Sequence, residues 1–323
     1  MKPRRLGSIV APVVLALVLT IPLGRELGAA GQQGANYLGP KLCAACHKAS
    51  HPEVVTSWSA SAHARAMWRV QDADEERRIA ADFENNPPFP KDKVAYVLGT
   101  GSKSQAFLDK ELRVLPAEWL VKEKTWRSRE AADATTGCLG CHTTGFDPET
   151  RQWKALGVGC EMCHGPGSSH VGAKDKQGTI VAVGKLGPAS RAMVCGQCHA
   201  QGRSKDGRFA FPRGYQPGDD LNQFFVLADE VPKGAMNSQY NELAKAGKHL
   251  AAGTVCDTCH QPHGPVKNLP AQLRQPVTQL CLSADCHGGK LTGAQHEPEA
   301  LAKVSCPTCH MPGSRHTFST QER

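Results

Sequence analysis

The pattern of apolar and polar residues begins with one long apolar run near the N-terminus. Residues 8–23 carry no charge, three basic residues precede them, and the small residues Gly28, Ala29 and Ala30 follow. This order is typical of an export signal cleaved near residue 30, and its length also allows an uncleaved membrane anchor. We expect the rest of the chain to be periplasmic or otherwise extracytoplasmic.

Shorter patterns predict small elements further along the chain. Alternating segments bounded by Gly and Pro predict a small β-sheet around residues 93–122, in which Trp119 and Trp126 pack against a cofactor or form ordinary core. The strands are expected at Val94–Leu98, Gln105–Leu108 and Glu111–Leu115. Helical stretches are expected at Trp58–Ala66, Asp72–Ala81 and Tyr240–Leu250.

The composition does not suggest a conventional packed core. Apolar residues make up 40% and aromatic residues 6%, while the chain contains 32 glycines and 22 prolines. A loop-rich chain of this kind needs another source of stability. We predict a mainly α fold with much irregular loop.

All fourteen cysteines occur in pairs, and a histidine directly follows each pair. Six pairs have two residues between the cysteines, and the sixth in order has four. The motifs are Cys43/Cys46/His47, Cys138/Cys141/His142, Cys160/Cys163/His164, Cys195/Cys198/His199, Cys256/Cys259/His260, Cys281/Cys286/His287 and Cys306/Cys309/His310.

This spacing has a chemical reason. Two thiols three residues apart reach the two vinyl-derived carbons on one porphyrin edge, and the next histidine lies under the iron. Structural zinc sites have no use for a histidine after every pair, and chance would produce seven such histidines with a probability on the order of 10⁻¹⁰. We therefore predict seven covalently attached c-type haems instead of disulfides or zinc.

The formal charge of +8 does not indicate a nucleic-acid partner. Cleavage after Ala30 would remove a net +3. Haem propionates would then bring the total to roughly −2 when the irons are ferric and −9 when they are ferrous. The expected partners are redox proteins, such as a quinol-side donor or a terminal reductase or oxidase.

The remaining histidines match the number of sixth iron ligands that seven haems need. They are His51, His63, His170, His249, His263, His296 and His316. His170 and His263 follow their nearest motifs so closely that we expect each to serve a neighbouring haem. His51 is the weakest candidate, and without it one haem would have an open site or another ligand. The methionines that could substitute are Met67, Met162, Met193, Met236 and Met311.

Motif positions predict the organisation of the chain. After a signal at 1–30, the predicted parts are a first haem module at 31–70, a connector with the sheet at 71–137, a module for haems two to four at 138–200, a loop connector at 201–235 and a module for haems five to seven at 236–323. About 42 residues per haem mean that the porphyrins themselves form much of the core.

Several segments resemble the multihaem cytochromes of the c-554/c-552 type. They are 136–147 (TGCLGCHTTGFD), 157–170 (GVGCEMCHGPGSSH), Trp58–Ala64, Lys248–His263 and Cys306–His316. The resemblance implies a mainly helical haem-packed fold with stacked haem pairs. It also places six histidines at family-like ligand positions: His63, His170, His249, His263, His296 and His316. Seven motifs and the four-residue spacer depart from the tetrahaem pattern.

Two functions remain open at this stage. The match between haems and spare histidines favours an electron carrier, because a bis-histidine iron has no vacant position for a substrate. The alternative is an oxidoreductase that acts on a small nitrogen or sulfur compound at one open haem, as in some relatives of the same group.

Overall fold

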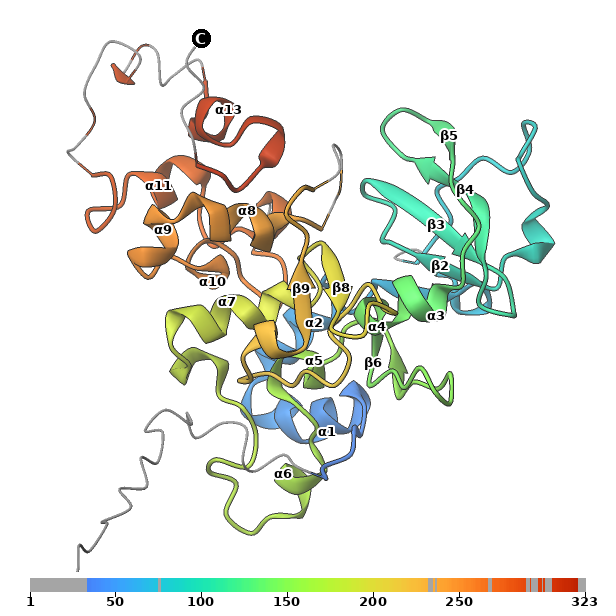
Figure 1. Cartoon of the computed structure of the whole chain (residues 1–323), viewed down its shortest axis with the longest axis horizontal. Helices are drawn as coiled ribbons and strands as arrows, with labels where there is room; N and C mark the ends of the chain where they lie inside the picture. The colour runs from blue at the N-terminus through green and yellow to red at the C-terminus, as the bar shows by residue number, and fades with distance from the viewer. Residues whose placement is uncertain are drawn as a thin grey trace, which may run out of the picture.

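Figure 1 shows the computed structural model of the chain. The structure describes residues 34–74, 77–231, 235, 237–266, 269–288, 291, 296–297, 299 and 304–318. The predicted export signal lies outside these residues. Within the described part of the chain, no helix combines the length and apolar character needed to cross a membrane.

A five-stranded antiparallel sheet forms the β-rich part of the molecule. Its strands follow one another in chain order. They are β1 (Met67–Arg69), β2 (Tyr96–Leu98), β3 (Ser104–Leu108), β4 (Val114–Leu120) and β5 (Thr125–Ser128). The predicted sheet is therefore present, and it extends beyond the expected range on both sides. We refer to residues 67–128 as the sheet insertion.

One face of the sheet insertion carries an aromatic core. Phe107 is fully buried, and its ring lies 5.6 Å from that of Phe83, 5.8 Å from that of Phe89 and 5.6 Å from that of Trp126. Trp119 and Trp126 pack edge to face with ring centres 5.3 Å apart. Of the two roles considered for these tryptophans, the structure thus shows ordinary core packing.

The opposite face joins the insertion to the second cysteine-pair motif. Met67, Leu98 and Leu108 pack there against Ala134 and Leu139. These last two residues belong to α3 (Ala134–Gly137) and α4 (Leu139–His142). Cys138 lies between the two helices, and α4 contains Cys141 and His142. The sheet is therefore a support for this motif.

Short helices surround the motifs in the remaining structure (Figure 1). The helices that contain or adjoin motif residues are α1 (Pro40–Ser50), α5 (Glu161–His164), α7 (Pro188–Gly196), α10 (Cys256–Cys259), α11 (Val277–Cys281) and α13 (Cys306–His310). The others are α2 (Pro52–Ser59), α6 (Ser168–Gly172), α8 (Gln239–Ala246) and α9 (Lys248–Ala251). Short two-stranded pairs, β6 (Thr143–Thr144) with β7 (Ala155–Leu156) and β8 (Gly202–Ser204) with β9 (Phe225–Leu227), complete the fold.

The mainly α prediction is only partly supported, because helices account for 34% and strands for 14% of the structure. The predicted helix at 72–81 is wrong: the described residues there form a 3₁₀ turn at Val70–Asp72 and then irregular backbone. Side-chain bonds replace helical ones, because Asp74 accepts from the Arg77 amide and Gln105 accepts from the Ala80 amide.

Other predicted boundaries shift for local reasons. The strand expected from residue 111 begins at Val114, because Leu112 adopts a turn conformation with φ +67°. The helix expected through residue 66 ends at Ser59, so His63 lies in a turn. Gly247, with φ +53°, divides the predicted 240–250 helix into α8 and α9.

Candidate haem-binding sites

Six of the seven motif histidines have the ring of a second histidine about 6 Å away. The ring centres are 6.1 or 6.2 Å apart in all six pairs. The pairs are His47 with His170, His199 with His63, His164 with His263, His287 with His249, His260 with His316 and His310 with His296.

This spacing fits an iron between two imidazoles. A metal–imidazole bond of about 2.0 Å, with about 1.1 Å from nitrogen to ring centre, places two axial rings about 6.2 Å apart. Direct ring stacking would bring the centres closer, whereas unrelated histidines would show no common distance. The repeated ring-centre distance is therefore the observation that most strongly supports haem binding between the two histidines of each pair.

Backbone carbonyls hold several of these rings by one nitrogen. Nδ1 of His164 lies 2.8 Å from the Val181 oxygen, and Nδ1 of His260 lies 2.8 Å from the Ala271 oxygen. A protonated Nδ1 that donates to a carbonyl leaves Nε2 with its lone pair, which is the form that binds a metal. These carbonyl contacts therefore orient the two imidazole rings so that Nε2 is the nitrogen available to a metal.

Burial favours the neutral form of several of these rings. Burial lowers the pKa of His199 to about 4, the nearby His63 and other histidines add to the effect, and a hydrogen bond that the ring donates to the Gln239 side-chain oxygen opposes it. Burial also lowers the pKa of His63. Neutral imidazole is the ligand state of histidine, so this electrostatic environment suits axial coordination.

Two distal histidines lie opposite motifs other than their nearest ones in sequence. His170 follows the His164 motif, yet its ring faces His47 at 6.2 Å. His263 follows the His260 motif, yet its ring faces His164 at 6.2 Å with the two planes parallel within 1°. Each of these contacts joins two motifs that are far apart in the sequence.

His51 lies next to a motif that already has a distal partner. Its ring centre is 5.8 Å from that of His47, and its amide bonds to the His47 carbonyl at the end of α1. Because His51 follows His47 by one helical turn, both side chains leave the same side of the helix. A porphyrin bound by His47 would therefore have His51 on its proximal side and His170 on its distal side.

His142 differs from the other six motif histidines. Its Nδ1 lies 3.0 Å from the Ala66 carbonyl oxygen, as expected for an oriented ligand, and burial lowers its pKa. All fourteen histidines are among the residues that the structure describes, and none of the ring contacts found there pairs a second histidine with His142. The sequence had pointed to His51 as the doubtful ligand without showing which haem would lack one.

Of the methionines considered as substitutes, Met67 and Met193 have other contacts. Met67 is buried in the sheet insertion, and the Met193 sulfur accepts a bond from the Leu221 amide at 3.4 Å. Met236 lies outside the described residues.

Contacts between motifs arrange the sites in a branched series. Glu161, inside the His164 motif, accepts bonds from the amides of Leu38 and Gly39 at the start of α1. The thiols of Cys43 and Cys160 also lie next to each other. The His47 and His164 motifs are therefore neighbours.

Gln197 connects three motifs. Its side chain donates to the Met162 carbonyl in the His164 motif at 2.8 Å, and its own carbonyl lies 3.8 Å from the Cys141 sulfur of the His142 motif. Gln197 itself stands between the two cysteines of the His199 motif. The His199 motif is thus the branch point, with the His142 motif to one side.

The series continues toward the C-terminus. Arg191 and Asp257 form an ion pair of 2.9 Å between α7 and α10, where Cys195 and Cys256 are adjacent. Cys259 is near Cys286, and α11 packs on α13, where Cys281 is adjacent to Cys306. The complete order is His47, His164, His199, His260, His287 and His310, with His142 joined at His199.

Cys309 is the second cysteine of the last motif. It lies half-buried on α13, directly before His310. Within the described part of the chain, neither a hydrogen bond nor the thiol of another motif is found at its sulfur, in contrast to Cys306. The structure thus does not bear on haem attachment at Cys309, which depends on its spacing from Cys306 and His310 and stays a prediction.

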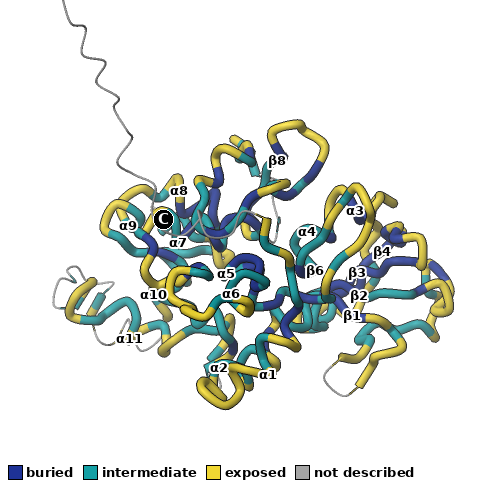
Figure 2. Tube along the Cα trace, turned by 90° about the horizontal axis from the view of Figure 1, so that it is seen from below, coloured by how far each residue is buried: buried dark blue, intermediate teal, exposed yellow. Residues whose placement is uncertain are grey.

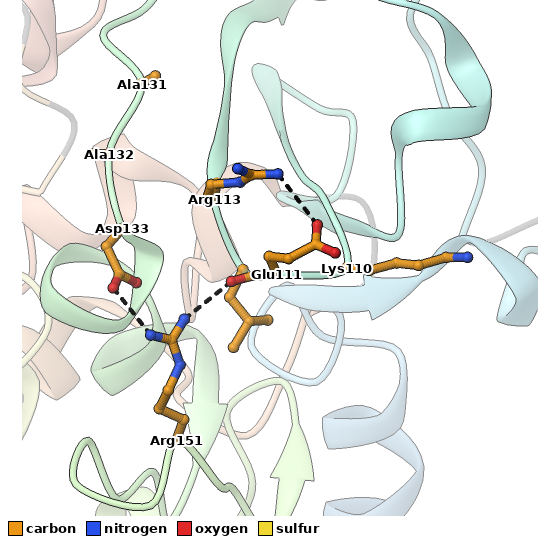
Figure 3. Close-up of a pocket in the computed structure, with 8 residues that line it drawn as sticks. Lys110, Glu111, Arg113, Ala131, Ala132, Asp133 and Arg151 are labelled. Atoms are coloured by element: carbon orange, nitrogen blue, oxygen red, sulfur yellow. Dashed lines mark hydrogen bonds and ion pairs between the residues drawn. The ribbon is translucent and has the colours of Figure 1, made fainter.

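A pocket of about 780 Å³ lies apart from the motif residues, at the edge of the sheet insertion (Figure 3). Four of the charged side chains that line it form two ion pairs: Arg113 approaches Glu111 at 3.4 Å, and Arg151 approaches Asp133 at 3.3 Å. Asp133 also caps α3 by accepting from the Thr135 amide. The two ion pairs and the cap of α3 therefore account for Glu111, Arg113, Asp133 and Arg151 as residues that stabilise the fold.

Comparisons with known proteins support the class of multihaem c-type cytochromes. Residues 103–165 match the family described as cytochrome c554 and c-prime, and residues 248–292 match a doubled CXXCH motif. These matches support haem c as the cofactor.

Among individual proteins, cytochrome c-554 of Nitrosomonas europaea is 30% identical over 172 residues. That match covers 51% of this chain and 52% of the relative, so the similarity spans about half of each protein. The fold resembles the outer cell wall cytochrome OcwA, with a TM-score of 0.68 and 23% identity over 88% of this chain and 78% of that one. It also resembles the octahaem sulfite reductase MccA of Wolinella succinogenes, with a TM-score of 0.50 and 19% identity over 89% and 56% of the two chains.

Proposed function

We propose that this chain is an exported seven-haem cytochrome that passes electrons between redox partners along bis-histidine haems. The observation that carries the proposal is the common 6.1–6.2 Å spacing of six histidine pairs, each containing one motif histidine. An iron held by two imidazoles has no vacant position, so it exchanges electrons without binding substrate.

The protein would contribute position and tuning, while the haems supply the one-electron chemistry. Adjacent motif thiols would bring porphyrin edges close together along the series from His47 to His310. Carbonyl bonds to Nδ1, as at His164 and His260, orient the imidazoles and influence the electron density that they donate.

The end of the series at His47 offers a place for a redox partner. Cys46 and His47 are exposed, and Lys41 and Lys48 lie on the same helix. A small, charged contact near an exposed haem edge is typical of transient electron-transfer complexes. The donor and acceptor themselves would be redox proteins on the extracytoplasmic side.

Two measurements test the conduit. Intact mass of the mature protein should show seven haem additions and loss of residues 1–30. After pulse radiolysis, electrons should redistribute from the site of first reduction over the other haems within one molecule, at a rate independent of protein concentration. A concentration-dependent rate would contradict an internal path.

The His142 site supports a second candidate function, because none of the histidines that the structure describes has its ring opposite that of His142. We propose that this haem has an open position and acts on a small nitrogen or sulfur compound, with electrons arriving through the adjacent His199 site. The similarity in fold to a sulfite reductase is compatible with this proposal and does not identify the substrate.

Binding of a neutral ligand tests the open position. Titration of the fully reduced protein with carbon monoxide should reach an end point at one equivalent per chain. The variant His142→Met should change the spectrum of that complex, whereas His51→Ala should leave it unaltered. Absence of binding to the unaltered protein would restrict the function to electron transfer.

A further inference from the structure

A fully buried carboxylate lies inside the His164 motif. Glu161 stands between the two cysteines of that motif and has no exposed surface. Its Oε1 accepts bonds of 2.8 Å from the amides of Leu38 and Gly167, and its Oε2 accepts a bond of 2.7 Å from the amide of Gly39. A buried amide without an acceptor is costly, so the carboxylate holds both backbone segments in place.

The two segments held by Glu161 lead into the helices that carry one histidine pair. Gly39 directly precedes α1, which contains His47. Gly167 directly precedes α6, which contains His170. The carboxylate therefore joins α1, α5 and α6, which lie next to one another (Figure 1). The rings of His47 and His170 are 6.2 Å apart, with their planes 15° from parallel.

Further contacts fix the same two segments against each other. The Asn36 amide donates to Ser168 Oγ at 2.7 Å, and the Ser168 amide donates to the Asn36 carbonyl at 3.2 Å. Gly39 has φ +90°, which favours glycine, and the chain turns there into α1. A Cβ atom at Gly167 would lie only 3.1 Å from Glu161 Oε1. The start of α1 thus has little freedom to move relative to the start of α6.

We propose that Glu161 is a positioning residue for the haem of the His47 motif, because it sets the distance and angle between the two histidines of that pair. This inference rests on the bis-histidine haems proposed above and adds the residue that determines the geometry of one of them. The orientation of axial ligands tunes an iron centre, and residues that hold those ligands control it.

The variant Glu161→Gln tests this role in the haem-loaded full-length chain. Glutamine has a similar shape, but one of its terminal atoms is an amide donor, so at least one backbone amide loses its acceptor. Electron paramagnetic resonance of the ferric protein should show a changed low-spin signal for one haem, with a fraction of that haem in the high-spin state. The matched control is Glu118→Gln, which alters a buried glutamate paired with Arg127 and Arg129 and should leave every haem signal unchanged.

A double variant identifies the affected haem. His170→Ala removes one axial ligand of the His47 haem and should by itself convert one haem to high spin. Adding Glu161→Gln to His170→Ala should produce no further high-spin haem, because both substitutions act on the same iron. An additive increase, or an unchanged spectrum in Glu161→Gln alone, would show that Glu161 does not position this pair. If His170→Ala leaves the number of high-spin haems unchanged, the pairing of His47 with His170 is itself wrong.

Hydrogen exchange separates positioning from a general loss of stability. In Glu161→Gln, exchange at residues 36–39 and 167–170 should rise about tenfold, while residues 256–318 keep their protection. Ser168→Ala, which removes only the Oγ acceptor of the Asn36 amide, is a milder variant and should cause a smaller change at the same haem. If Glu161→Gln does not fold, an unchanged spectrum in Ser168→Ala would contradict the proposal. Faster exchange along the whole chain, with changes at several haems, would show that Glu161 only stabilises the fold.

Discussion

The sheet insertion and the C-terminal region from residue 256 onward are stabilised in different ways. The insertion buries a full set of apolar side chains, including Val97, Phe107 and Leu108 with no measurable exposure. Among the described residues from 256 to 318, no apolar side chain is buried. Figure 2 shows this contrast, with dark blue along β1 to β4 and mostly teal and yellow around α10 and α11.

The difference indicates what takes the place of a core in the C-terminal region. That region holds three motifs, and each motif histidine belongs to one histidine pair, so its interior would consist mainly of porphyrin. Folding there should depend on haem attachment, as in other folds that form around a ligand. The insertion needs no cofactor for its own core.

The largest expected effect follows from haem removal. A chain produced without haem attachment should lose amide protection throughout residues 256–318, while β2 to β4 keep theirs, because only the insertion has its own apolar core. Hydrogen exchange with mass spectrometry measures both regions in one sample. Equal amide protection in the two regions would contradict the claim that only the C-terminal region depends on haem for its stability.

A core substitution in the insertion should have the next largest effect. Phe107→Ala removes the ring at the centre of the aromatic core and should lower the free energy of unfolding of the insertion by about 3–5 kcal/mol. Thermal unfolding followed by tryptophan fluorescence would report this loss, while the Soret spectrum of the C-terminal haems stays unchanged. Val226→Ala, at a side chain 52% exposed, is the control with little expected change.

Loss of one distal histidine should act on the C-terminal region alone. His316→Ala removes the ring 6.1 Å from that of His260 and should raise local hydrogen exchange on the order of tenfold, because one of two axial bonds is lost. The same variant should convert one low-spin haem to high spin. His51→Ala should change neither the hydrogen exchange nor the spin state of a haem. A low-spin to high-spin conversion in that variant would show that His51 is an iron ligand.

The smallest effect concerns acid stability of the insertion. Burial would raise the pKa of Asp109, but bonds from the Arg113 amide and guanidinium, together with its charge, lower the pKa overall. A lowered folded-state pKa stabilises the fold above the unfolded value, and the contribution disappears as pH falls through the folded value. Asp109→Asn should cost about 0.5–1 kcal/mol at neutral pH and less in acid. A pH-independent difference between the two proteins would contradict this explanation.

The sequence predicted the chemistry of the motifs better than their spatial arrangement. Cysteine spacing determines where a porphyrin can attach, because that constraint is local. The partner of His164 is His263, 99 residues further on, and only tertiary contacts can bring the two together. The position of His51 one turn after His47 was a usable signal, since it argues against ligation across the same haem and leaves six distal histidines for seven motifs.

Secondary structure was predictable where the pattern was not overridden by side-chain bonds. The strand at 104–108 matches its alternating pattern, whereas the charged stretch after residue 72 lost its predicted helix to bonds made by Asp74 and Gln105. The ion pairs of Glu118 with Arg127 and Arg129 could not be predicted at all. Glu118, Arg127 and Arg129 meet only through the register of β4 with β5.

Electron paramagnetic resonance of the fully oxidised protein, with spin quantitation, tests the central claim most directly. The account predicts six low-spin ferric haems and one high-spin haem per chain, the latter changed by substitution of His142. Seven low-spin haems, or a high-spin signal that persists unchanged in the His142 variant, would contradict it.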